Sequence, residues 1–161
     1  MGHLGSVIDE KIRQFIEAQH VFFVASAPLD PQGHVNLSPK GLDTFRILGP
    51  ATVGYLDLTG SGVETIAHLR ENGRIVLMFC AFQNSPKIVR LHGRGRVVET
   101  NEPEFESLKT HFESLEGARA IIMVDVLRVS DSCGFGVPIL RYEDDRPQLD
   151  AWIRSKGPEG L

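Results

Sequence analysis

Six short runs rich in β-branched, aromatic and aliphatic residues constrain the fold of this chain more than any other feature. Turn-forming residues separate them, as in "PLDPQG" at 28–33. Residues 74–82 are apolar on both faces, which is typical of a central strand. The six predicted strands are "VFFVASA" (21–27), "HVNLS" (34–38), "ATVGYLDL" (51–58), "RIVLMFCAF" (74–82), "KIVRLHGRGRVVE" (87–99) and "AIIMVDVLRVSDS" (120–132).

The segments between and around these runs predict only short helices. The first three are expected to begin at Ser6, at Ser61 and near Asn101, and the fourth spans about 145–156. Gly73 is suited to end the second helix. The expected buried faces are Ile8, Ile12, Phe15 and Ile16; Val63, Ile66 and Leu69; Phe105, Leu108, Phe112 and Leu115; and Leu149, Trp152 and Ile153.

This order of elements does not fit a doubly wound parallel sheet, which alternates strands and helices regularly. Pro39 and Gly41 are expected to end the second strand, because proline cannot donate to a strand ladder and glycine permits a sharp change of backbone direction. We therefore predict a mostly β fold, a six-stranded antiparallel barrel with helices packed on its outside.

Length and composition are those of an ordinary globular domain. The 161 residues suit a single domain spanning 1–161, and the abrupt ending "KGPEGL" suggests that some natural tail is missing. A formal net charge of −4 argues against a general nucleic-acid binder. There is no membrane-length apolar run, no secretory signal, and no CxxC pair formed by Cys80 and Cys133. We therefore expect a cytoplasmic protein that contacts neither nucleic acid nor membrane.

The first candidate site is Ser38-Pro39-Lys40-Gly41, at the end of the second predicted strand. A lysine at a strand end can place a positive charge at a cavity mouth, where a phosphate would bind. The alternative is a hairpin exit with one solvated lysine, and the sequence pattern alone favours it.

The second candidate is Thr59-Gly60-Ser61-Gly62, which opens a predicted helix. Helix N-termini bind anions because their first backbone N–H groups have no partner and the helix dipole is positive there. Thr59, Ser61 and Thr65 would add hydroxyl donors, whereas Glu64 would oppose an anion unless it points away. In the alternative interpretation, Ser61 and Glu64 only cap the helix.

The third candidate is the polar face of the strand at 87–99, which carries Arg90, His92, Arg94 and Arg96. A solvated outer face explains Arg94 and Arg96, and Arg90 is the better candidate for a site. "HGRGR" lies within a strand and is no dinucleotide fingerprint. The histidines have no metal-ligand spacing, and the sequence indicates no catalytic residue.

Taken in order, these stretches resemble the pyridoxamine 5′-phosphate oxidase-like family of FMN-binding split barrels. The resemblance runs from about Val21 to Val98. It rests on "VFFVASA", "GHVNLSPKG", "ATVGYLDLTGSGVETIAHLRENGRIVLMF" and "PKIVRLHGRGRVV", which occur in the order typical of the family. The flanking stretches resemble one uncharacterised branch of that family.

The resemblance implies a homodimer with FMN in two clefts at the subunit interface. Asn36, Leu37, Ser38 and Lys40 would line the ring and ribityl side, with Lys40 reaching the phosphate. The remaining residues carried over from the family are Thr59, Ser61 and Thr65 at the phosphate, and Arg90 near the phosphate or the flavin edge.

Three departures separate this chain from true pyridoxamine phosphate oxidases. Those enzymes carry an Arg-Lys pair where this chain has Glu64 and Thr65, and a glutamine where it has Ile88. Their arginine- and tryptophan-rich C-terminal motif has no equivalent after Trp152. The resemblance therefore implies a flavin-dependent reductase or oxidase of another small molecule. The alternatives are a deazaflavin-dependent reductase, a flavin or haem carrier or sensor without turnover, and a barrel without cofactor.

Overall fold

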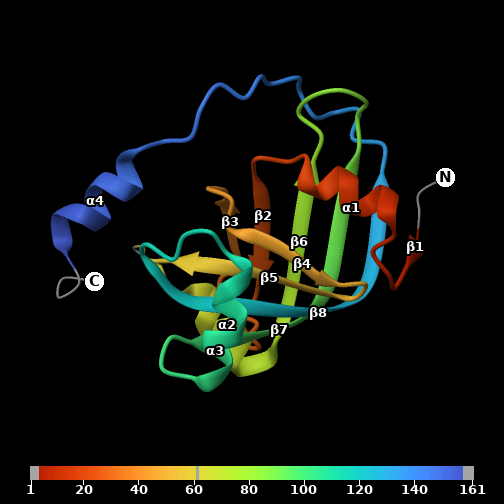
Figure 1. Ribbon diagram of the computed structural model, residues 1–161. Helices are drawn as coiled ribbons and strands as arrows, with labels where there is room; N and C mark the ends of the chain where they lie inside the picture. Colours follow the sequence, from red (N-terminus) through yellow and green to blue (C-terminus); the bar gives the residue numbers. More distant parts are fainter. Residues whose placement is uncertain (1–3, 61, 158–161) are drawn as a thin grey trace.

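The computed structural model describes residues 4–60 and 62–157, which form a mostly antiparallel β barrel with helices outside it (Figure 1). The sheet runs in the order β3-β2-β6-β7-β8-β5-β4, and β1 pairs with β8. The strands are β1 (Leu4–Gly5), β2 (Phe22–Ser26), β3 (Asn36–Lys40), β4 (Phe45–Gly49), β5 (Thr52–Leu58), β6 (Arg74–Cys80), β7 (Ile88–Glu99) and β8 (Ala118–Ser132). The helices are α1 (Glu10–Glu17), α2 (Glu64–Asn72), α3 (Pro103–Leu108), a 3₁₀ turn η1 (Lys109–His111) and α4 (Gln148–Lys156).

The fold class is confirmed, and all six predicted strands are present. The number six is too low, because the described residues form eight strands. The short run "FRILG" of β4 follows the turn at 41–44 and had been assigned to no element, and β1 has only two residues. Residues 62–157 and 4–60 contain no helix long and apolar enough to cross a membrane.

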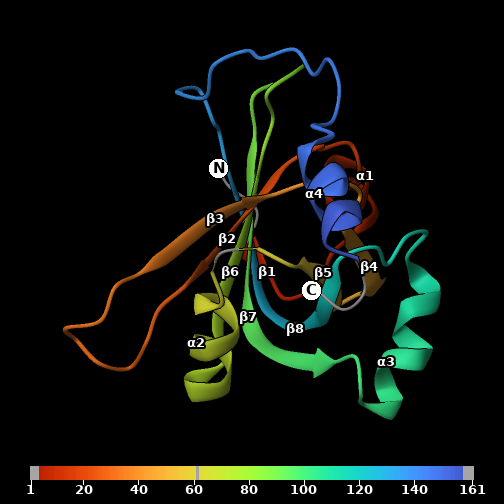
Figure 2. The ribbon, with the colours of Figure 1, turned by 90° about the vertical axis from the view of Figure 1, so that its left-hand side faces the viewer.

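The second predicted strand is displaced by two residues. It was expected at 34–38 and to end at Pro39, but β3 continues through Pro39 to Lys40, and Pro39 lies opposite Phe23 of β2. β3 is an edge strand, where one side of the backbone has no ladder partner, so a residue without an N–H is tolerated. In Figure 2 the β2–β3 hairpin projects away from the barrel.

The predicted helices exist, but most begin at other residues. Asp9 caps α1 by accepting a hydrogen bond from the Ile12 N–H at 2.8 Å, in place of Ser6. α2 begins after Val63, which is exposed rather than buried, and ends at Gly73 as predicted. α3 begins after Glu102 and not at Asn101, and the Glu102 side chain makes no capping hydrogen bond. In α4 only Ile153 is buried, while Leu149 is half-buried and Trp152 is exposed.

Two apolar clusters form the core. The larger lies inside the barrel, where Ile12 and Ile16 of α1 pack against inward-facing residues such as Leu77 and Leu91. The smaller packs Phe105 of α3 against Ile121 of β8. The larger cluster includes residues of β5 and α2, two of the elements that form the site described below, and β3 is held beside it by pairing with β2.

A contact at Gly117 holds α4 against the barrel. Gly117 has a φ of +74°, and a Cβ there would lie 2.2 Å from Cδ1 of Ile153. We expect Gly117→Ala to cost about 1–2 kcal/mol for the left-handed backbone alone and to release α4. Thermal unfolding and tryptic cleavage after Arg154 measure both effects. Gly136→Ala is the control, since no atom lies within 4 Å of its Cβ position. Equal behaviour of the two variants would contradict this role of Gly117.

Candidate functional site

A cleft of about 310 Å³ lies where β3 approaches β5 and the start of α2. Asn36, Ser38 and Lys40 reach it from one face of β3, because alternate residues of a strand point the same way. Thr65 reaches it from α2, and its Oγ1 accepts a hydrogen bond from Asn36 Nδ2 at 2.9 Å. We call it the Lys40 cleft. The other lining residues are Asp57, Leu58, Gly60, Gly62, Glu64 and Arg119.

A buried carboxylate lies at the centre of the Lys40 cleft. Asp57 of β5 is only 1% exposed, and it lies between two cations. Lys40 Nζ is 3.4 Å from Oδ1, and Arg119 Nε donates to Oδ2 at 2.6 Å. A buried carboxylate is stable only when its charge is compensated by close partners. The three side chains therefore form one unit, in which Lys40 and Arg119 together compensate the buried charge of Asp57.

Two buried hydroxyls near this unit lack a hydrogen-bond partner among the described residues, Ser38 Oγ and Tyr55 OH. Tyr55 precedes Asp57 by two residues on the same inward face of β5. Its burial, and secondarily the charge of Asp57, raise the pKa of Tyr55 well above its usual value, so the hydroxyl keeps its proton. A buried polar group without a partner is uncommon. Ser38 Oγ is therefore a donor that a ligand in the Lys40 cleft could use.

Glu64 places a second carboxylate on the cleft. It is the first residue of α2, where the helix dipole stabilises a negative charge. Its carboxylate lies over Gly62, where an added Cβ would be 2.2 Å from Oε2. Lys40 and Arg119 carry two positive charges and Asp57 and Glu64 two negative ones, so the four formal charges sum to zero. Whatever binds here interacts with individual cations and not with a strongly positive field.

The structure brings together four of the eight predicted cofactor-binding residues: Asn36, Ser38, Lys40 and Thr65 line one cleft. Leu37 lies on the other face of β3 and is 62% exposed. Thr59 does not line the cleft, because its hydroxyl donates to the Gly117 carbonyl at 2.9 Å. The predicted residue Ser61 lies outside the described residues.

Arg90 is also separate from the Lys40 cleft. It pairs with Met78 of β6, which in turn lies opposite Phe23 of β2, and Phe23 lies opposite Pro39. Residues matched in this way share one face of a sheet, so Arg90 is on the face of Pro39 and opposite to that of Lys40. Its guanidinium donates to Ser132 Oγ at 3.1 Å. Its contact with a cofactor stays a prediction.

Asp57 and Arg119 were not predicted as site residues. Asp57 had a usable signal, because in "VGYLDL" it shares the strand face of Val53 and Tyr55, and a charge on a buried face requires a partner. Arg119 had no such signal in the sequence, because it lies before the predicted start of its strand at residue 120.

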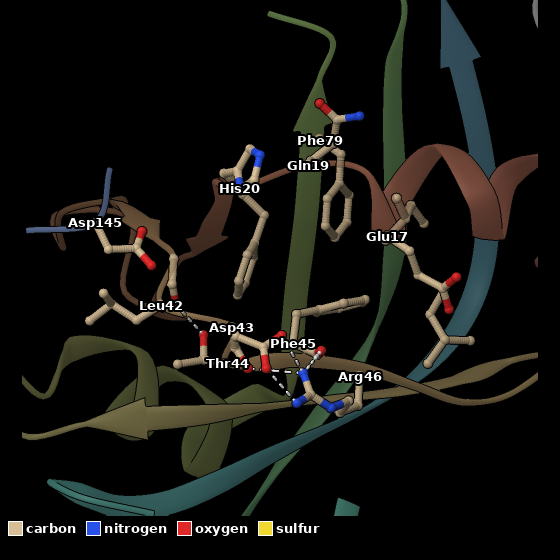
Figure 3. A pocket seen from close by; sticks show the side chains of 14 residues that line it. Glu17, Gln19, His20, Leu42, Asp43, Thr44, Phe45, Arg46, Phe79 and Asp145 are labelled. Atoms are coloured by element: carbon tan, nitrogen blue, oxygen red, sulfur yellow. Dashed lines mark hydrogen bonds and ion pairs between the residues drawn. The ribbon is translucent and has the colours of Figure 1, made fainter. Parts of the chain in front are cut away.

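A second cavity has a volume of about 430 Å³, and Figure 3 shows the residues that line it. We call it the aromatic cavity, because Phe22, Phe45 and Phe79 line it with ring centroids 5.0–5.6 Å apart. Gly41 also lines the aromatic cavity and directly follows Lys40, which lines the Lys40 cleft, so consecutive residues of the chain contribute to the two cavities. The other half of its lining is polar or charged: Glu17, Gln19, His20, Asp43, Thr44, Arg46 and Asp145. Concave sites that combine aromatic side chains with polar groups are typical of small-molecule binding.

The loop between these cavities has unusual backbone geometry. Leu42 and Asp43 both have positive φ, at 59° and 55°, which is uncommon for residues other than glycine. Arg46 holds the loop by donating to both carboxylate oxygens of Asp43, at 2.8 and 2.7 Å, as Figure 3 shows. Thr44 Oγ1 donates to the Gly41 carbonyl at 2.8 Å. Strained backbone that is held in this way is concentrated at functional sites.

An antiparallel split barrel with a cleft that holds two cations is the class of fold that these observations define. Residues 8–133 match the family model described as pyridoxamine 5′-phosphate oxidase. The chain is 47% identical over 137 residues to the pyridoxamine 5′-phosphate oxidase family protein ustO of Aspergillus flavus. This chain belongs to the pyridoxamine 5′-phosphate oxidase family.

The match to ustO covers 83% of this chain but only 55% of that relative, so the chain spans about half of its length. Solved structures share the fold at low identity. An FMN-binding protein of Syntrophomonas wolfei is 19% identical, with a TM-score of 0.55 over 82% of this chain and 87% of that one. A FAD-binding protein of Mesorhizobium loti is 14% identical, with a TM-score of 0.55 over 81% and 96%.

Proposed function

We propose that this protein is an FMN-dependent oxidoreductase that acts on a small organic molecule other than pyridoxamine phosphate. One observation carries the proposal: Ser38, Lys40 and Thr65, predicted from sequence as cofactor contacts, converge with Arg119 on one cleft. The names of the Syntrophomonas and Mesorhizobium proteins as FMN- and FAD-binding support a flavin.

The donors of the Lys40 cleft fit the phosphate of FMN. Lys40 and Arg119 supply charge-assisted donors, and the unpartnered Ser38 hydroxyl supplies a neutral one. The first N–H groups of α2 have no helical partner and suit an anion. Bound FMN supplies hydride or electron transfer. The chain's own residues hold the phosphate, orient the ring system and exclude water from it.

The aromatic cavity is the place we assign to the second reactant. Its three phenylalanine rings and its polar side chains suit a small organic molecule that carries polar groups. Gly41 lines this cavity and directly follows Lys40, the proposed phosphate cation. Glu64 and Ile88, which replace cofactor-binding residues of the vitamin-forming enzymes, support an activity other than vitamin synthesis.

Anaerobic mixing of the FMN-loaded protein with NADH or NADPH tests the proposed activity. Loss of the flavin absorbance, followed by its return on addition of an electron acceptor, would establish an oxidoreductase. If FMN binds stably but neither NADH nor NADPH reduces it, the protein would instead be a flavin carrier or sensor. If the protein copurifies with a deazaflavin or with haem, each recognised from its own spectrum, that group would take the place of FMN in this proposal.

We propose that the protein is a homodimer, in keeping with the two interfacial clefts that the family resemblance implies. The outer face of β3 exposes Leu37 at 62%, next to Val35 at 72%. Phe23 and Met78 are half-buried on the same face, and contiguous exposed apolar surface favours association.

We expect Leu37→Arg to convert the dimer into a monomer, because the substitution would bury a charge in the contact without a partner. Sedimentation velocity measures the change. Leu29→Arg is the matched control, since Leu29 is 61% exposed in the turn before β3 and not on the sheet face. A wild-type monomer, or a dimer that survives Leu37→Arg, would contradict this interface.

A further inference from the structure

The Lys40 cleft contains a cation whose position depends on an irregularity of the sheet. β8 pairs with β5 so that Ala120 lies opposite Asp57 and Ala118 opposite Leu58. Arg119, between them, has no partner on β5 and is the extra residue of a β-bulge. Regular alternation would place Arg119 on the face of Ile121, which packs in the cluster under α3. Bulges redirect side chains, and this one is accompanied by contact between Arg119 and Asp57.

The bonds of Arg119 hold its guanidinium at the cleft. Nε donates to Asp57 Oδ2, and Nη2 donates to the carbonyl of Gly62, two residues before the start of α2. A guanidinium has five N–H donors, so these two bonds leave three without a partner within residues 4–60 and 62–157. Its side chain is 24% exposed. Arg119 is therefore fixed on one side and able to donate on the other.

Lys40 is held in a matching way from the opposite side of the same carboxylate. Its ammonium lies 3.4 Å from Asp57 Oδ1, its side chain is 23% exposed, and it makes no other hydrogen bond to the described residues. Asp57 thus sets the spacing of two cations that both line one cleft. Without Arg119, Lys40 would be the one described cation of the cleft, against the carboxylates of Asp57 and Glu64, and a phosphate would be repelled overall.

We infer that Arg119 is the second phosphate-binding cation of this cleft, and that Asp57 is the positioning residue that holds Lys40 and Arg119 for it. The inference rests on the proposed function and deepens it, because it names the residue that makes the site selective for a phosphorylated flavin. In this chain a cation from the β8 bulge would take the place of cations at the start of α2, where Glu64 and Thr65 stand.

Titration with FMN and riboflavin, which differ by the phosphate, tests the inference through flavin fluorescence quenching. We expect the wild type to prefer FMN. Arg119→Met should weaken FMN binding by about 10- to 100-fold, the equivalent of one charge-assisted hydrogen bond, and leave riboflavin binding unchanged. Glu64→Gln, which removes an opposing charge, should tighten FMN binding alone. Arg96→Met is the control. Arg96 belongs to β7, pairs with Glu104 of α3 and does not line the cleft.

Two outcomes separate the inference from the proposed function. If the wild type binds neither flavin, the proposed function fails and the inference fails with it. If the wild type prefers FMN and Arg119→Met keeps that preference, or loses both flavins equally, only the inference fails. Arg119→Lys covers the case in which Arg119→Met does not fold. It keeps the charge beside Asp57 but loses the planar donor set, so it should fold and show a reduced preference for FMN. An undiminished preference in this variant would overturn the role of Arg119.

Discussion

Asp57→Ala is expected to lower the free energy of unfolding by about 3 kcal/mol, the low end of the range for removing one partner of a buried ion pair. The substitution leaves Lys40 and Arg119 facing each other without the carboxylate that now separates them. The low end applies because the two cations are 23% and 24% exposed and can gain some solvation. Urea unfolding followed by far-UV circular dichroism measures the loss.

Glu104→Ala is the matched control for this prediction. Glu104 accepts two hydrogen bonds from Arg96, at 2.7 and 2.6 Å, but it is 43% exposed. Exposed ion pairs contribute about 0.2–1 kcal/mol, so this variant should lose far less stability than Asp57→Ala. Similar losses in the two variants would contradict the view that burial of Asp57 makes its ion pairs essential to the fold.

Lys40→Ala is expected to weaken FMN binding by about 10- to 100-fold, because it removes one of two charge-assisted donors to the phosphate. The fold should survive, since Arg119 still compensates Asp57. Fluorescence quenching measures the affinity, and riboflavin, which has no phosphate, should bind the variant and the wild type equally. Lys11→Ala, an exposed lysine of α1, is the control. Full FMN affinity in Lys40→Ala would show that Lys40 does not bind the phosphate.

The strands of the barrel could be predicted because most of them carry a clear period or a continuous apolar run. β6 and β7 are found close to the predicted ranges, since β6 is apolar on both faces and the first half of β7 alternates. β4 was missed because five residues between two turns give too little pattern. Pro39 was taken as a strand end because its tolerance depends on β3 being an edge strand, which only the topology reveals.

Part of the candidate site could be predicted through the family resemblance, which named Asn36, Leu37, Ser38 and Lys40 as cofactor contacts. Asn36, Ser38 and Lys40 alternate on β3, and the structure places all three in one cleft. Arg119 could not be predicted, because its direction depends on a register shift between β5 and β8. Helix starts also differed, as at Asp9, because several polar residues near a helix start compete to cap it and tertiary packing selects one.

Titration of the purified protein with FMN tests the central claim most directly. The protein should carry or take up one FMN per chain, show a flavin absorbance spectrum, release FMN on denaturation, and bind FMN more tightly than riboflavin. Titration with FAD in the same assay shows whether the cleft also accepts a flavin whose phosphate is extended to a diphosphate that carries adenosine. A colourless protein that binds none of these flavins would contradict the assignment of the Lys40 cleft as a flavin phosphate site.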